Sequence, residues 1–163
     1  MNVAVSMSRV RMEARSRPDR PVLDSVTFAV LGGEFAAVVV SSPSARLALR
    51  AVLDRSERPT AGTVFIAASS IAVLESSTPE RLPAAPLDAH PQLVIADDPT
   101  GGLDGHAARR VMEHLHALDD GCRTIVLLTH DGDLARRHAR RVILISDGRV
   151  VRDADATLCP PGG

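Results

Sequence analysis

Two adjacent carboxylates and one histidine are the side chains of this sequence best suited to chemistry. Asp97 and Asp98 directly follow an apolar run, within the segment LVIADDPTGGLD. His130 follows a second apolar run, TIVLLT, 33 residues after Asp97. Ligands of open α/β sheets bind beyond the carboxyl ends of the strands, so we expect the three side chains to meet at one such edge.

Composition excludes several other chemistries. Among 163 residues, the 19 basic residues are all Arg, and Lys, Trp and Tyr are absent. A Schiff-base lysine, a lysine general base and a phosphate-binding lysine are therefore excluded. Nucleic-acid readers that stack bases need aromatic platforms, and three Phe are too few for one. The formal net charge of -1 gives no general attraction to nucleic acid or to an anionic membrane.

Charge and cysteine content narrow the class of protein further. Residues 61–105 carry one Arg against six acidic residues, so a cation is expected to bind in this middle stretch. Cys122 and Cys159 do not fit a zinc-binding spacing. The sequence has no signal-peptide pattern and no run of 18 apolar residues, which predicts an intracellular chain with reduced thiols.

Apolar runs and amphipathic segments define the elements that must position these residues. Fully apolar runs predict strands buried on both faces at 35–40, 93–97 and 124–129. Helical periodicity predicts helices over 44–55, with Ser44 as N-cap, and over 106–118. This alternation predicts an α/β domain with a parallel core.

The remaining segments are expected to frame this core. Residues 3–12 predict an edge strand, 13–21 a loop with two prolines, and 22–30 a second strand that pairs antiparallel with the first. We expect residues 68–91, which are rich in Ser and Pro, to be irregular. Other predictions are a strand at 63–67, a short helix over 131–139, a terminal hairpin at 142–152 and a disordered tail at 153–163.

Taken together, these segments resemble the ATP-binding subunits of ABC transporters, nearest to the lipoprotein-releasing and macrolide-export type. LVIADDPT resembles the Walker B segment of that family, Gly101, Gly102, Leu103 and Asp104 resemble its D-loop, and His130 resembles its switch histidine. The resemblance implies that Asp97 binds Mg²⁺ and that Asp98 stands in the place of the catalytic glutamate, with His130 beside it. It also implies that the D-loop contacts a second subunit.

The phosphate-binding loop departs from the family pattern G-x-x-x-x-G-K-[ST]. Aligned without a gap, the pattern places Val40 and Ala45 where the family has glycine, and Leu47 where a hydroxyl would coordinate Mg²⁺. Pro43 has no N–H to offer a phosphate oxygen. Arg46 replaces the lysine with a wider, planar group. The residues left as candidate phosphate contacts at the start of this helix are Ser41, Ser42, Ser44 and Arg46.

A second departure is a deletion. Between the strands at 63–67 and 93–97 the family inserts a Q-loop, a helical subdomain and an L-S-G-G-Q signature, but here only residues 68–92 fill that space. We therefore expect a P-loop NTPase-like α/β fold with a mostly parallel sheet, flanking helices and antiparallel N-terminal strands. A single shortened domain is expected over 1–152, without the helical subdomain.

The resemblance implies an ATP-binding subunit of an ABC-type membrane transporter, with ATP and Mg²⁺ as cofactors and with impaired or no hydrolysis of its own. Asp98 is one methylene shorter than glutamate, and the placement of an attacking water is sensitive to about 1 Å. The alternative is a non-catalytic pseudo-ATPase that serves as a structural or regulatory partner of an intact cassette. A decayed gene product without a role is a third reading.

The implied partners are a transporter permease subunit and another ATP-binding subunit, in a homodimer or heterodimer. We expect no nucleic-acid partner and no direct insertion into a membrane. The expected location is cytoplasmic, peripheral to the inner face of the cell membrane.

Overall fold

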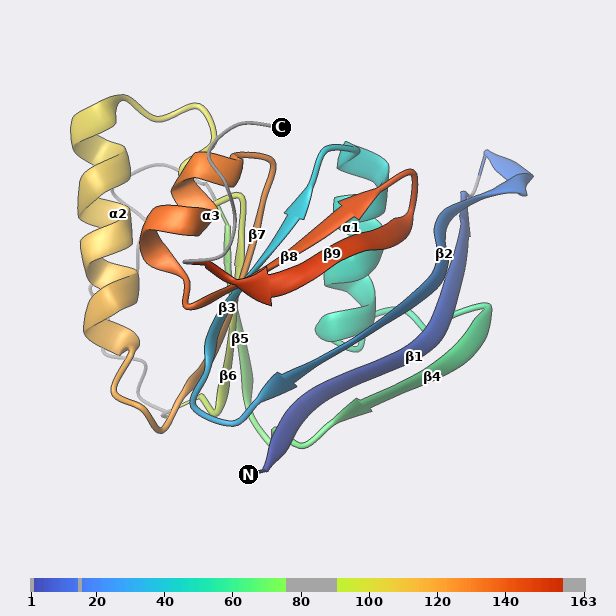
Figure 1. Ribbon diagram of the computed structural model, residues 1–163, viewed down its shortest axis with the longest axis horizontal. Coiled ribbons are helices and arrows are strands. Elements are labelled where there is room, and N and C mark those ends of the chain that lie inside the picture. The colour runs from blue at the N-terminus through green and yellow to red at the C-terminus, as the bar shows by residue number, and fades with distance from the viewer. Residues whose placement is uncertain (1, 15, 76–90, 157–163) are drawn as a thin grey trace.

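The computed structural model describes residues 2–14, 16–75 and 91–156, which form two sheets and three helices. The larger sheet has six strands in the order β5-β6-β7-β3-β8-β9 (Figure 1). The strands that pair in parallel are β5 (Ile71–Glu75), β6 (Leu93–Asp97), β7 (Thr124–Thr129), β3 (Phe35–Val40) and β8 (Arg141–Ser146). The predicted parallel core is confirmed.

A second, antiparallel sheet has the order β2-β1-β4, with β1 at Val3–Ala14, β2 at Arg17–Leu31 and β4 at Ala61–Ile66. The predicted edge position of residues 3–12 is wrong, because β1 pairs on both sides. Most of the predicted loop at 13–21 is also wrong, since Pro21 lies in β2 and is paired with Glu13. Proline is tolerated there because β2 is an edge strand, where a missing N–H can face away from the ladder.

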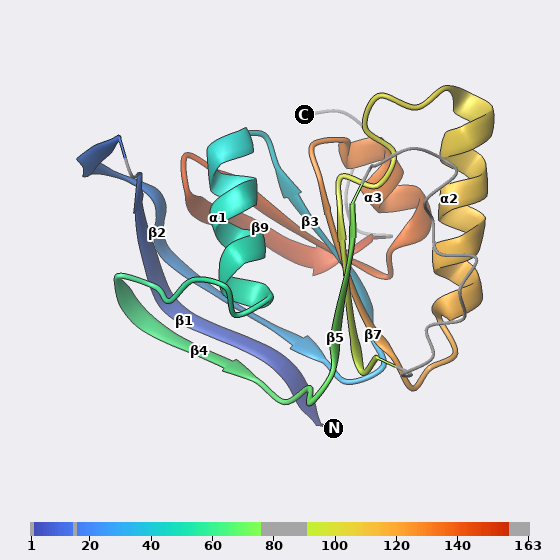
Figure 2. The same cartoon turned by 180° about the vertical axis from the view of Figure 1, so that it is seen from behind.

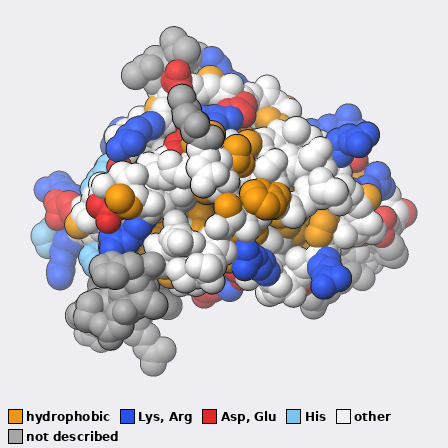
Figure 3. Space-filling view, turned by 90° about the horizontal axis from the view of Figure 1, so that it is seen from below, with side chains coloured by type: hydrophobic (Ala, Val, Ile, Leu, Met, Phe, Trp, Pro, Cys, Tyr) orange, Lys and Arg blue, Asp and Glu red, His pale blue; other side chains and the backbone are white. Residues whose placement is uncertain are grey.

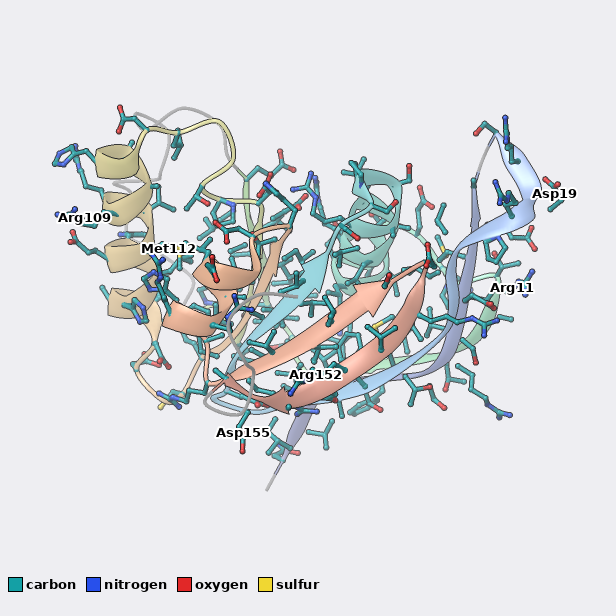
Figure 4. All side chains as sticks on the ribbon, turned by 45° about the horizontal axis from the view of Figure 1, so that its top comes forward. Arg11, Asp19, Arg109, Met112, Arg152 and Asp155 are labelled. Atoms are coloured by element: carbon teal, nitrogen blue, oxygen red, sulfur yellow. The ribbon has the colours of Figure 1, made fainter. Side chains whose placement is uncertain are left out.

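The helices cover the larger sheet from both sides. α1 (Pro43–Leu53) lies between the two sheets, whereas α2 (Gly105–Leu118) and α3 (Gly132–His138) lie on the opposite face of the larger sheet (Figures 1 and 2). Figure 4 shows Arg109 projecting outward from α2, while Met112 on the same helix is buried. The predicted helices are therefore confirmed, with small shifts in their ends.

The side chains of β3 alternate between two hydrophobic cores, which explains why the sequence of this strand is apolar throughout. Ala36, Val38 and Val40 belong to the core shared with α1 and the antiparallel sheet. Phe35 and Val39, on the other face, belong to the core shared with α2 and α3. Because successive side chains of a strand point to opposite faces, a strand covered on both sides must be apolar throughout.

Two predicted boundaries need correction. Residues 71–75, expected to be irregular, form β5, which extends the parallel sheet beside β6. The C-terminal strand β9 (Arg149–Asp155) pairs antiparallel with β8 and runs three residues into the predicted tail. The rest of that tail beyond residue 156, and most of the predicted irregular segment (76–90), lie outside the described residues.

Charged and apolar side chains are intermingled on the surface of the described residues. On the face seen in Figure 3, Arg side chains stand apart from one another around a middle that carries several hydrophobic groups. Within the described ranges, no helix has both the length and the apolar character needed to cross a bilayer.

Candidate functional site

The predicted carboxylates and histidine do meet at the carboxyl edge of the larger sheet. Asp97 is the last residue of β6, Asp98 follows it, and His130 follows the neighbouring strand β7. The Nδ1 atom of His130 lies 3.2 Å from Oδ1 of Asp98. Glu75 ends β5 in register with Asp97, so a third carboxylate reaches the same edge.

A guanidinium from α1 lies against the carboxylate pair. Nη1 of Arg46 is 2.9 Å from Oδ2 of Asp98 and 3.4 Å from Oδ1 of Asp97. These contacts are ion pairs without hydrogen-bond geometry, because Nη1 of Arg46 and Oδ1 of Asp97 are buried and lack a hydrogen-bond partner. The sequence places Arg46 at the phosphate loop, and the structure brings it to the carboxylates.

A second guanidinium completes a charge network around Asp97. Arg50 is one turn further along α1, 3.5 Å from Oδ2 of Asp97 and 3.6 Å from Asp54, and it also forms an ion pair with Glu75. Arg46 and Arg50 share a helix face because they are four residues apart. That spacing was the available signal for Arg50, while Glu75 could be found only once β5 was known to lie beside β6.

Burial and charge act on Asp97 in opposite directions. Its side chain is only 6% exposed, and this burial raises the pKa of the carboxyl group above its ordinary value. The Arg46 and Arg50 guanidinium groups oppose the increase, whereas the nearby Glu75 carboxylate adds to it. The ionised form of Asp97 thus depends on its two arginine partners.

The backbone after β6 has an unusual conformation at Asp98 and passes close to its side chain. Asp98 has φ 45°, in the left-handed region, and its N–H donates to the carbonyl of Leu128 at 2.7 Å. Gly101 approaches so closely that a Cβ there would collide with Oδ2 of Asp98. A residue other than glycine at 101 would therefore move the Asp98 carboxylate.

At the start of α1, two backbone N–H groups bond to Ser42 and one residue has no N–H. Only Ser41 and Ser42 separate β3 from the helix, and Ser42, not the predicted Ser44, is the N-cap: its hydroxyl accepts from the N–H of Ala45 at 3.3 Å. The N–H of Arg46 donates to the carbonyl of Ser42 at 3.0 Å, and Pro43, the first helical residue, has no N–H. Ser44 lies exposed in the first turn.

The residues that resemble a D-loop lead directly into α2. Asp104 is the N-cap of this helix, and its carboxylate accepts from the N–H of Ala107 at 2.8 Å. Gly102 has φ 74°, which favours glycine, and both Gly102 and Asp104 are exposed. The segment Gly101 to Asp104 thus has a local role in starting α2 and presents part of its backbone at the surface.

Neither Mg²⁺ nor a nucleotide fits the residues at this edge. Leu47 offers no oxygen where the family pattern has a metal-binding hydroxyl, and the positive Arg46 guanidinium lies against both carboxylates that would hold a cation. Among the described residues, no group of three or more acidic, His or Cys side chains could hold a metal ion. For a phosphate group, the first turn of α1 has few N–H groups left unbonded.

Solved structures with the same architecture are ATP-binding cassettes of transporters. The chain superposes on cbiO1 of Clostridium perfringens, part of the ABC transporter complex cbiONQ, with a TM-score of 0.77 and 15% identity, covering 96% of this chain and 90% of that one. It also superposes on the ATP-binding cassette MJ0796 bound to ADP and Pi, with a TM-score of 0.76 and 19% identity, covering 93% and 98%. The fold is that of the ABC ATPases, as expected from the sequence.

Sequence relatives point to the same class. The chain is 50% identical over 82 residues to a macrolide export ATP-binding/permease protein of Rhodospirillum rubrum, covering 45% of this chain and 12% of that protein. It is 47% identical over 70 residues to the protein of that name in Bordetella avium, covering 43% and 10%. The match spans about a tenth of each relative's length, and no protein-family profile matches. In sequence over less than half of its length, and in fold over nearly all of it, the chain is similar to ATP-binding cassettes of ABC transporters.

Proposed function

We propose that this chain is a non-hydrolysing ATP-binding-cassette domain that acts as the structural or regulatory partner of an intact cassette in a membrane transporter. The single observation that carries the proposal is the way in which the N-terminal turn of α1 is capped and hydrogen-bonded. There Ser42 caps Ala45, Pro43 removes one donor, and the Arg46 N–H is bonded within the helix. Few N–H groups are therefore left at this helix terminus to bind a phosphate group.

The carboxylates support the same conclusion. A residue that orients an attacking water needs a free carboxylate oxygen. Oδ2 of Asp98 lies 2.9 Å from the Arg46 guanidinium, so one of its two oxygens already has a cationic partner, while Oδ1 lies 3.2 Å from His130. The ion pair of Asp98 with Arg46 thus supports the proposed loss of hydrolysis.

The features that remain serve assembly. The D-loop from Gly101 to Asp104 is intact, ordered by the Asp104 cap and partly exposed. The relatives are named as ATP-binding/permease proteins for macrolide export, in which the cassette and the permease belong to one protein. A second cassette and a permease are thus the proposed partners, at the cytoplasmic face of the membrane.

The competing candidate is an ATP-binding subunit with slow turnover. It is favoured by one observation: Asp97, Asp98 and His130 are still assembled at one edge, with His130 within 3.2 Å of Asp98. The two candidates differ in whether this chain alone releases phosphate from ATP.

Co-expression with a permease and an intact cassette encoded beside this gene tests the proposal. The proposal expects recovery of the chain in a complex with these subunits, and no phosphate release by the chain alone. Leu103→Asp in the D-loop should reduce recovery at least tenfold, whereas Val151→Asp, at a 58% exposed position of β9, should not. A strictly monomeric chain, or phosphate release lost in Asp98→Asn, would contradict it.

A further inference from the structure

We infer that Arg46 is a fixed internal counter-ion, which occupies the cation position between Asp97 and Asp98 and excludes divalent cations from it. One guanidinium nitrogen lies within 3.4 Å of an oxygen of each carboxylate. A hard divalent cation bridging the same two oxygens would need the space that this nitrogen fills. The inference rests on the proposed function only in taking the carboxylate pair as the cation site of a cassette.

The helix holds the guanidinium in place. Arg46 lies in the first turn of α1, whose start is fixed by the Ser42 cap, and the neighbouring Ala45 and Leu49 are buried in the core. The Arg46 side chain is only 18% exposed, and its carboxylate partners are also largely buried. An entering cation must therefore displace a charge attached to the same chain, which acts at high effective concentration.

Arg50 pairs with the second carboxylate oxygen of Asp97. It approaches Oδ2 of Asp97 while Arg46 faces Oδ1, so both oxygens of this carboxylate have a guanidinium partner. Arg50 is also engaged by Asp54 and Glu75. Removal of Arg46 alone thus frees Oδ1 of Asp97 and Oδ2 of Asp98, while Arg50 continues to hold the Asp97 side chain.

This arrangement predicts a gain of metal binding on loss of Arg46. In Arg46→Gln the two freed oxygens form a small site that suits Mn²⁺ or Mg²⁺, because carboxylate and water ligands favour these ions. We expect Mn²⁺ to bind this variant at least tenfold more tightly than it binds the wild-type chain. The gain should disappear in the double variant Arg46→Gln/Asp97→Asn.

Titration with Mn²⁺ alone, followed by the electron paramagnetic resonance signal of the free ion, tests the inference. Arg109→Gln is the matched control, since Arg109 is exposed on α2, away from the site (Figure 4), and it should behave as wild type. The inference is overturned if wild type binds Mn²⁺ as tightly as folded Arg46→Gln does, or if that variant gains no binding. Because no nucleotide is present, the result does not depend on whether the chain binds ATP.

A measurement on the unmodified chain covers the case in which Arg46→Gln fails to fold. The thermal midpoint of wild type should be the same with and without millimolar MnCl₂, because a ligand raises it only by binding the folded state. An increase that is absent in Asp97→Asn would show that a cation enters beside Arg46, and would overturn the inference.

Discussion

The Arg46 guanidinium lies 2.9 Å from the carboxylate of Asp98 and joins the first helix to the loop that follows β6. In an intact cassette, the resemblance implies a lysine on phosphate at the first position and a water-orienting glutamate at the second. Here the two residues interact with each other. The chain's own side chains thus satisfy the charges that a bound cofactor would otherwise meet.

Loss of Arg46 should destabilise the fold. In Arg46→Ala the buried Asp97 keeps only Arg50, and Asp98 loses its closest cationic partner. We expect the free energy of unfolding, measured by urea denaturation, to fall by about 1–3 kcal/mol, below the usual loss for a fully buried pair because Arg50 remains. Arg109→Ala, an exposed arginine of α2, should change it by less than about 0.5 kcal/mol. Equal effects of the two substitutions would count against this network.

Gly101 should be intolerant of a side chain. A methyl group at 101 would collide with Oδ2 of Asp98, so Gly101→Ala must displace that carboxylate from Arg46. We expect a loss of about 1–3 kcal/mol in the free energy of unfolding, the range for overpacking a well-packed position. Gly105→Ala is the matched control, because nothing lies within 4 Å of a Cβ there. If Gly101→Ala unfolds at the same urea concentration as wild type, the close approach is not present.

A histidine pair between α2 and α3 should make stability depend on pH. Nε2 of His116 lies 2.8 Å from Nδ1 of His138, and the His116 ring also packs against Phe35. Burial lowers the pKa of His138 below 6.5, and the charges of His116 and Arg137 add to this. Unfolded His138 therefore binds a proton more readily than folded His138, so this stability is present above pH 6.5 and is lost as pH falls through the lowered pKa.

Urea denaturation at pH 7.5 and at pH 5.5 checks this prediction. Wild type should lose up to about 1 kcal/mol more between these values than His138→Gln does. His106→Gln, at an exposed position in the first turn of α2, should retain the wild-type dependence. The difference between variants also cancels the contribution of Asp97. An unchanged pH dependence in His138→Gln would contradict the role of the pair.

The sequence was sufficient to predict the central strands of the larger sheet. It was not sufficient to predict the pairing of β1 or the presence of β5. Strands such as β3 are apolar throughout because both faces are covered, a local pattern that does not depend on distant pairing. β1 was misplaced at an edge because its second partner, β4, is about 50 residues away in the chain. β5 was missed because its five residues are followed by a Ser- and Pro-rich segment and are stabilised by β6.

For the site, the sequence identified Asp97, Asp98 and His130 because each follows an apolar strand. It did not predict the contact of Arg46 with the carboxylates, since the direction of a long side chain depends on where its helix packs. Arg50 was not among the predicted site residues, yet it lies against Asp97. Charge alone could not decide between a phosphate, solvent and a carboxylate as the partner of either arginine.

Isothermal titration of the wild-type chain with ATP in the presence of Mg²⁺ measures whether this site still takes up nucleotide. In the first turn of α1 the Ala45 and Arg46 N–H groups bond to Ser42, and the Arg46 guanidinium lies against both carboxylates. We predict no saturable heat up to millimolar ATP. Saturable binding at millimolar or lower ATP, abolished by Asp97→Ala, would show that the site is still open to nucleotide.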